Sequence, residues 1–436
     1  MLSTVQNILA IPELRRRIAF TLSILAVYRI GCHVPTPGID GQVLSQFFAG
    51  TEGTLLGLVS AFTGGALEMM AVFALGIMPY ISASIILQLL TVVYEPLEKL
   101  SKEGEQGRKK ITEYTRYGTI VLAIIQGAGM AYGLQGMVGP AGEPVVPNPG
   151  AGFILMTVIT LTAGTAFVMW LGEQITERGI GNGISLIIFA GIVAGMPSAI
   201  VNTLRLLETG AMTPTVVIFI LALMLATVGA IVFMERAQRR VPIHYAKRVV
   251  GMRNMGGQSS HLPMKINMAG VIPPIFASSI MMFPATIASF VDAPWVQQVS
   301  GYLSPEHLVY NIFYVAFIVF FCYFYTAITF NPVNVAENIK NQGGFVPGIR
   351  PGKETATYLD TVLSRLTFAG AIYVSAVCVL PTVLISQLNV PFFFGGTALL
   401  IVVAVGMDTS AQIDAHLISR SYEGFMKGVT LKGRHG

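Results

Sequence analysis

The sequence has little charge for its length. Asp, Glu, Lys and Arg make up only 11% of its 436 residues, whereas an ordinary soluble domain carries about 25%. Hydrophobic residues make up 53%. So few polar side chains cannot cover a water-soluble protein of this size, which excludes that class. The composition therefore indicates a membrane protein with several spans.

Cysteine and histidine are also scarce. The three cysteines, Cys32, Cys322 and Cys378, lie far apart and fit no metal-binding or redox spacing. We interpret them as small apolar packing residues. The six histidines are scattered, and the sequence contains neither an HExxH motif nor a phosphate-binding loop. We therefore predict no metal, no cofactor and no enzymatic activity.

Charged side chains are missing from the middle of the apolar runs. Glu68, Glu173, Asp408 and Asp414 lie towards the ends of these runs. Ion-coupled transporters and pumps usually need an ionisable group inside the membrane. This absence disfavours a secondary transporter of small solutes, which we keep as the alternative hypothesis. An intramembrane enzyme is disfavoured in the same way, because it would need paired catalytic residues at matched depth.

Ten apolar runs have about the length that a membrane helix needs, since about 20 residues make one span. We expect helices because only helices or closed barrels can span, and barrel strands would alternate in polarity. The fold class that we predict is an all-α membrane protein with ten transmembrane helices. The runs lie near 18–31, 71–93, 117–137, 153–172, 183–203, 214–234, 269–290, 309–330, 366–386 and 394–412.

Basic residues are sorted to one side of the predicted helices. With a cytoplasmic N-terminus, 25 of the 27 Lys and Arg residues fall on the inside, and only Arg29 and Arg205 fall outside. This distribution follows the positive-inside rule and predicts that both termini are cytoplasmic. Ten helices divide into two halves of five, which suits an inverted repeat. We expect these pseudo-symmetric halves over residues 1–203 and 204–436.

One apolar stretch, Leu55–Val93, is too long for one span and too broken for two. Its first part, Leu55–Leu67, contains several glycines and is too short to cross. Its second part, Ala71–Val93, is long enough for a full span, which we expect to bend near its start at Gly76 and Pro79. A half-length helix folded back before a full one must pack against protein or line a cavity, because lipid leaves backbone groups unpaired.

Two inside loops, 235–265 and 331–365, are long and basic. One interpretation is topology alone, with basic residues holding the loops inside or binding anionic lipid. The other is docking of a partner, either an acidic protein surface or ribosomal RNA phosphate. Alternating apolar and basic residues at 241–255 predict a projecting ribbon or hairpin. The candidate partner-binding residues are Arg239, Arg240, Lys247, Arg248, Arg253, Arg350 and Lys353.

Long segments of the chain resemble a known family. The sequences Phe73-ALGIMPYISASIILQLL-Thr91 and Trp170-LGEQITERGIGNGISL-Ile187 are similar to the two signature motifs of the SecY/Sec61 family, in particular of its bacterial members. Further segments with this resemblance are 114–119, 267–289, 331–352 and 395–405. The resemblance covers nearly the whole chain.

The resemblance implies a protein-conducting channel in the bacterial cytoplasmic (inner) membrane. In this family a short external helix plugs an hourglass pore, and Leu55–Leu67 corresponds to that plug, with Ser60, Phe62, Gly64 and Gly65 in its middle. A ring of aliphatic side chains forms the constriction, where it can exclude ions by dewetting. The matching positions are Ile77, Ile81, Ile184, Ile188, Ile275 and Ile401.

The resemblance also implies a lateral exit between the second helix and the seventh and eighth. Ser82 and Gln88 in the second helix and Phe283 in the seventh are the candidate gate residues; packing and interhelical hydrogen bonding remain the alternative for the polar pair. The implied partners are signal-bearing precursor proteins, the SecA motor ATPase, the ribosome and small membrane subunits resembling SecE and SecG. Anionic lipids complete the set of expected partners.

Overall fold

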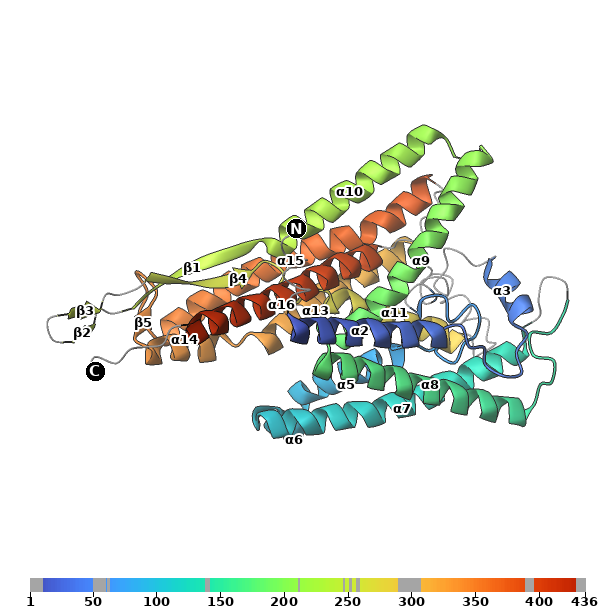
Figure 1. Cartoon of the computed structure of the whole chain (residues 1–436), viewed down its shortest axis with the longest axis horizontal. Helices are drawn as coiled ribbons and strands as arrows, with labels where there is room; N and C mark the ends of the chain where they lie inside the picture. The colour runs from blue at the N-terminus through green and yellow to red at the C-terminus, as the bar shows by residue number, and fades with distance from the viewer. Residues whose placement is uncertain are drawn as a thin grey trace. The chain divides into compact units, whose positions relative to one another are not determined.

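The structure is a computed structural model. It describes residues 11–49, 60, 63–137, 142–210, 212–245, 248–250, 253–255, 259–288, 307–388 and 396–428. Long helices dominate these residues (Figure 1). The helices are α2 (Pro12–Gly31), α3 (Gly41–Ala49), α5 (Met78–Val93), α6 (Glu95–Lys102), α7 (Glu105–Gln135), α8 (Ala151–Arg178), α9 (Gly183–Glu208), α10 (Pro214–Arg236), α11 (Ile272–Ala288), α13 (Leu308–Thr329), α14 (Pro332–Asn341), α15 (Lys353–Leu388) and α16 (Gly396–Gly428).

Each of the ten predicted apolar runs coincides with a helix, which confirms a helical membrane protein. Within the described part of the chain, seven helices are long and apolar enough to cross a membrane, or eight if α5 and α6 are one broken span. The axis bends by 99° between those two helices. Helix α2 falls outside this set since Arg15–Arg17 and Arg29 reduce its hydropathy. The number of ten spans therefore stays a prediction.

The start predicted for the second span, 71–93, is wrong. Helix α5 begins at Met78, with Pro79 in its first turn, and residues 64–70 and 72–77 form turns. Proline suits the first turn of a helix because its missing N–H would have no partner there anyway. Gly76 has a φ of +53°, a conformation that glycine adopts at little cost. Pro79 thus starts the helix instead of bending it.

The chain divides into two compact units. The first contains Met1–Glu208, Phe283–Ser300 and Ile401–Gly436, and the second contains Thr209–Met282 and Gly301–Leu400. The predicted division into symmetric halves at 203/204 stays a prediction. In the first unit, α3, the turns before α5, α7 and α8 enclose one hydrophobic core around Leu44, Met70 and Leu161.

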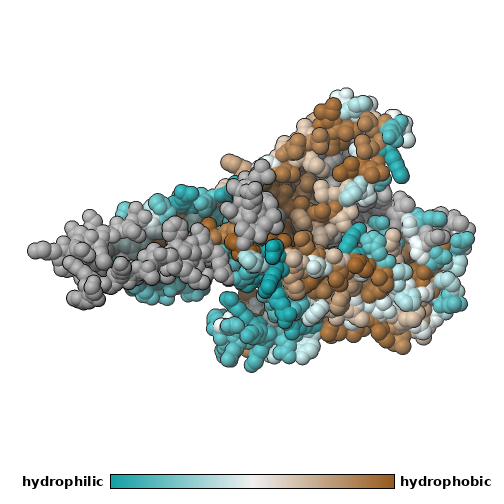
Figure 2. Space-filling model, viewed as in Figure 1, coloured by the Kyte–Doolittle hydropathy of each residue, from teal (hydrophilic) through white to brown (hydrophobic). Residues whose placement is uncertain are grey.

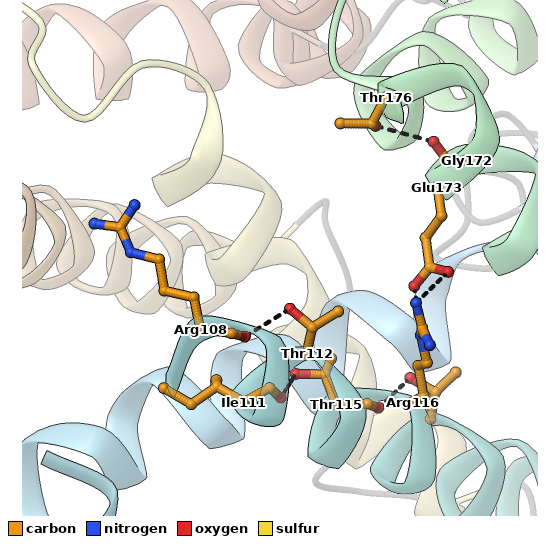
Figure 3. A network of polar contacts seen from close by, with 9 residues as sticks. Arg108, Ile111, Thr112, Thr115, Arg116, Gly172, Glu173 and Thr176 are labelled. Carbon is orange, nitrogen blue, oxygen red and sulfur yellow. Dashed lines mark hydrogen bonds and ion pairs between the residues drawn. The ribbon is translucent and has the colours of Figure 1, made fainter. Parts of the chain in front are cut away.

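A bidentate salt bridge joins α7 to α8 in the first unit. Arg116 Nε and Nη2 each donate to a carboxylate oxygen of Glu173 over 2.8 Å (Figure 3). Nearby, Thr112 and Thr115 donate to the carbonyls of Arg108 and Ile111, each four residues earlier in α7. Such bonds satisfy the hydroxyl groups within the helix itself.

The second unit contains the β structure. Strand β1 (Gln238–Tyr245) pairs antiparallel with β4 (Ser259–Lys265) along its whole length, with Val241 opposite Leu262. Strand β5 (Gly344–Phe345) pairs with the other edge of β1, so the strand order is β4-β1-β5. A two-stranded ribbon continues the hairpin through β2 (Arg248–Val250) and β3 (Arg253–Met255). The predicted hairpin is confirmed for the residues that the structure describes.

Helix α8 offers a test of how tightly the turns before α5 are packed. A Cβ at Gly164 would lie 2.0 Å from the carbonyl oxygen of Val72, so Gly164→Ala must push backbone apart. We expect a loss of about 1–3 kcal/mol in the free energy of unfolding. Thermal unfolding of the purified membrane protein in detergent measures the change.

The matched control is Gly152→Ala in the same helix, where a Cβ meets no atom within 4 Å. This variant should be neutral or slightly stabilising, because alanine favours helix over glycine by about 1 kcal/mol. Equal melting temperatures for the two variants would contradict the packing described above.

Candidate functional site

The turns between Thr63 and Ile77 are held against the segment that follows α2. Thr36 N–H donates to Met70 O, and Val72 N–H donates to Val34 O, both over 2.9 Å. These bonds form an antiparallel bridge between Pro35 and Ala71. The turns that follow the predicted plug segment are therefore paired with protein backbone, as is required of a non-helical segment that cannot face lipid.

Helix α2 binds the start of these turns by its side chains. Tyr28 Oη donates to Thr63 O over 3.4 Å, and Cys32 Sγ donates to the same oxygen over 3.8 Å. Arg29 Nη1 donates to Gly64 O over 2.5 Å. We call this set of contacts, from Tyr28, Arg29 and Cys32 to Thr63 and Gly64, the α2 latch. Sequence reasoning missed it, although Arg29 stood out as one of two basic residues on the outside.

The turn at Gly64 also lies against α9. Its φ is +68°, and a Cβ there would lie 3.0 Å from Gly191 Cα and 2.9 Å from Arg29 Nη1. Ser60 is a further predicted plug residue that the structure describes. Its Oγ donates to Glu68 Oε1 over 2.6 Å. Gly65 also has positive φ, +82°. Phe62 and residues 55–59 lie outside the described residues, so the plug helix itself stays a prediction.

The predicted ring residues divide between the two units. Ile77, Ile81, Ile188 and Ile401 belong to the first unit and are 6%, 6%, 4% and 0% exposed. Ile184 is half-buried in the same unit, and Ile275 is half-buried in the second. Ile77 caps α5, and its carbonyl accepts from Ile81 N–H over 3.0 Å. The assembly of the six into one ring stays a prediction.

The loop before α9 is fixed by three other helices. Ile180 N–H donates to Thr21 Oγ1 of α2 over 3.1 Å, and Gly181 N–H donates to Gln412 Oε1 of α16 over 3.0 Å. Gly183 N–H donates to Thr176 Oγ1 of α8 over 2.9 Å. This loop sets the start of the helix that carries Ile184 and Ile188. Of these three supports, only Thr176 lies close to its partner in the sequence; Thr21 and Gln412 are far along the chain from the loop and carry no local signal.

The structure describes the side chains of two of the three predicted gate residues, Ser82 and Gln88. Ser82 is 6% exposed in α5, and Gln88 Nε2 donates to Ser84 Oγ over 3.3 Å within that helix. Gln88 Oε1 is buried and accepts no hydrogen bond from the described residues. Phe283 lies in α11, and its side chain is outside the described residues. A role in gating stays a prediction for all three.

The two basic loops meet in the three-stranded sheet. Pairing of β5 with β1 places Phe345 of the second loop opposite His244 of the first. Beneath the sheet, Val241, Met264 and Ile339 share one hydrophobic core with Leu359 of α15. Arg239, Arg240, Arg350 and Lys353 are exposed, whereas Lys247 and the side chains of Arg248 and Arg253 lie outside the described residues. The sheet thus joins the two basic loops: Arg239 and Arg240 lie in β1, whereas Arg350 and Lys353 follow β5 in the chain.

The described residues contain no group of three or more His, Cys, Asp or Glu side chains that could hold a metal ion. Cys32, Cys322 and Cys378 are all buried and free, as expected of packing residues. The arrangement offers instead a clamped turn, buried aliphatic side chains and an exposed basic sheet.

The SecY family model matches residues 71–410. The chain belongs to the SecY family. Protein translocase subunit SecY of Escherichia coli K12 is 52% identical over 425 residues, which cover 97% of this chain and 96% of that relative. Protein translocase subunit SecY of Aquifex aeolicus is 46% identical over 418 residues, covering 96% and 97% of the two chains.

Solved structures of SecY and Sec61 share the fold. A protein-conducting channel aligns with a TM-score of 0.64 at 18% identity, over 93% of each chain. A SecY protein whose plug domain stabilises the closed state of its channel aligns with a TM-score of 0.65 at 18% identity, again over 93% of each chain. Sec61 in a canine ribosome–channel complex gives 0.61 at 18% identity and the same coverage.

The α2 latch predicts a local change when Arg29 is replaced. Arg29→Met removes the donor to Gly64 O. A hydrogen bond to a charged donor contributes about 1.5–3 kcal/mol, so the amides of the turns 63–77 should exchange at least about tenfold faster. Hydrogen–deuterium exchange mass spectrometry of peptides over this stretch measures the effect.

Arg205→Met is the control, because it removes the other predicted outside cation, which is exposed near the end of α9. It should leave exchange over residues 63–77 unchanged. Identical exchange in the two variants would show that the latch does not stabilise these turns.

Proposed function

We propose that this chain is the pore-forming subunit of a protein translocase. It conducts unfolded secretory proteins across the membrane and releases membrane segments sideways into lipid. The observation that carries this conclusion is the 52% identity to Protein translocase subunit SecY over 97% of the chain. By its family the chain is a channel and not an enzyme.

The proposed closed state combines the plug and the ring. The clamped turns after residue 60 hold the end of the plug segment against α2 and α9, and the aliphatic side chains named above would line the constriction. A dry aliphatic ring excludes ions because they cannot shed their hydration shell there, yet it yields to an extended peptide. Displacement of the plug would open the path by breaking only non-covalent contacts such as the α2 latch.

Sideways release uses the transfer energy of apolar segments. A translocating segment of about 20 apolar residues is more stable in lipid than in water. We place the exit at Ser82 and Gln88 of α5 and Phe283 of α11, following the family resemblance. Gln88 Oε1, buried without a partner in the described residues, is a polar group that a moving gate could satisfy.

The energy for transport comes from a partner in this proposal, since the sequence contains no phosphate-binding loop. The exposed basic residues of the sheet are the proposed docking surface for a SecA-like motor or a ribosome, because clustered guanidinium groups bind carboxylates and phosphates. Small subunits resembling SecE and SecG, signal-bearing precursors and anionic lipids are the other proposed partners. We assign the chain to the bacterial inner membrane, with both termini cytoplasmic.

Reconstitution tests this function directly. Vesicles containing the purified chain with its small subunits should import a signal-bearing precursor only when motor and ATP are present. The same vesicles should not accumulate small solutes. Solute uptake without motor or ATP, together with failure to import the precursor, would favour the transporter hypothesis instead.

A polar residue in the proposed ring should weaken the seal. Ile77→Asn places an amide among aliphatic side chains, which favours water in the constriction. We expect a measurable ion conductance in planar bilayers and import of precursors with defective signal sequences. Ile86→Asn is the control, because Ile86 is 43% exposed and lies nine residues on, about half a turn out of phase. Equal conductance in both variants would argue against the ring.

A disulfide across the proposed gate should block passage. Ser82→Cys combined with Phe283→Cys should cross-link under oxidation and stop precursor import, and reduction should restore it. The pair Ser84→Cys with Phe283→Cys serves as control, since position 84 lies about 200° around α5 from position 82. Efficient cross-linking of the first pair with normal import would place the gate elsewhere.

A further inference from the structure

A side-chain hydrogen bond in the second unit joins the end of α10 to the segment before α11. Asn267 Nδ2 donates to Glu235 Oε1 over 2.7 Å. Asn267 is only 5% exposed, and Glu235 is half-buried. A carboxylate acceptor makes such a bond roughly twice as strong as a bond between neutral groups. We call this contact the α10–α11 brace, and none of the roles proposed above uses it.

Asn267 also closes the turn that leads into α11. Its Nδ2 donates to Gly270 O, and its Oδ1 accepts from Gly270 N–H, both over 3.1 Å. An α-helix would supply Gly270 O with the N–H of residue 274, but Pro274 has no N–H to donate. The Asn267 amide replaces that missing donor. Both Nδ2 hydrogens and the Oδ1 acceptor of this buried side chain are therefore used.

The brace lies directly beyond the base of the hairpin. The β1–β4 ladder reaches Gln238 opposite Lys265, and Ile266 N–H then donates to Ala237 O over 3.1 Å. Helix α15 packs against the same segment, because a Cβ at Gly370 would lie 2.8 Å from Ile266 O. Figure 2 shows a change from hydrophobic surface over α10 to hydrophilic surface over the hairpin. Since the hairpin is continuous with the brace, a displacement of the hairpin would act on the residues that start α11.

We propose that the α10–α11 brace holds α11 in the closed position of the proposed gate, which makes Asn267 a positioning residue. Tilting of the hairpin by a docked partner would separate Glu235 from Asn267. Helix α11 would then pivot at Gly270, where φ is +64° and a Cβ would meet no described atom within 4 Å. The inference rests on the proposed function in taking α11, which carries Phe283, as part of the gate.

Asn267→Asp tests the brace with almost no change of shape. The new carboxylate still accepts from Gly270 N–H, but it repels Glu235 and cannot donate to Gly270 O. Losing a charge-assisted bond should make the amides of residues 266–282 exchange at least about tenfold faster, and should raise import of precursors with defective signals by about tenfold. Hydrogen–deuterium exchange mass spectrometry of the purified complex measures the first effect, and the vesicle import assay measures the second.

Glu235→Gln is the matched control, because the new side chain keeps an Oε1 that accepts from Asn267 Nδ2. It should leave exchange and signal selection close to those of the original chain. Combined with Asn267→Asp, it places an amide donor opposite the new carboxylate and should restore part of both properties. A loss of packing at position 267 would not be reversed by this exchange of donor and acceptor. Rescue therefore separates the brace from a general loss of stability.

Glu235→Leu breaks the brace and leaves the turn between Asn267 and Gly270. It should relax signal selection by itself, and it decides the question if Asn267→Asp does not fold. Unchanged selection in Glu235→Leu would overturn the proposal, as would relaxation in Asn267→Asp that Glu235→Gln does not reduce. Loss of all import by a folded Asn267→Asp channel would also overturn it, because the brace would then be needed for opening.

The outcome is separate from that of the proposed function. If the original chain imports precursors and the brace variants select signals normally, only the brace assignment is lost. If the original chain imports no precursor, the proposed function is lost, while exchange over residues 266–282 still shows whether the brace holds α11.

Discussion

The structure depends on one constraint, the need to pair every backbone N–H and C=O inside the protein where no water is available. Regular helices meet this need by themselves, and most of the described chain is helical. The turns from Thr63 to Ile77 do not, so other segments supply their partners. Residues 34–36 pair with them by backbone, and the α2 latch binds the carbonyls of Thr63 and Gly64. A non-helical segment is stable inside such a protein only where neighbouring segments supply hydrogen-bond partners for its backbone.

Sequence reasoning predicted the helices and the hairpin, which depend on composition and on the spacing of apolar residues. Ten apolar runs predicted ten helices because hydrophobicity over about 20 residues is a strong signal, and alternation at 241–255 predicted the hairpin because strands have a period of two. The start of α5 was missed for a local reason. Residues 71–77 are as apolar as a span, but the positive φ at Gly76 and the position of Pro79 start the helix at Met78.

The supports of the candidate site could not be predicted, because they join residues far apart in the chain. Thr21 and Gln412 bind the backbone of Ile180 and Gly181, respectively, and nothing in the local sequence of either side chain indicates such a partner. The same holds for Gly164, whose need for close approach to Val72 depends on how α8 packs. Single residues of this kind become interpretable only when their neighbours in space are known.

The pairing of β5 with β1 has a mechanical consequence. The hairpin, α14 and the first turns of α15 share one core through Val241, Ile339 and Leu359, so they form a stiff base at one end of a helix of 36 residues. A helix of that length is about 54 Å long at 1.5 Å per residue. Tilting the base by about 5° would displace the far end by about 5 Å, close to one helical turn. A partner protein that binds the sheet and tilts it would therefore displace the far end of α15.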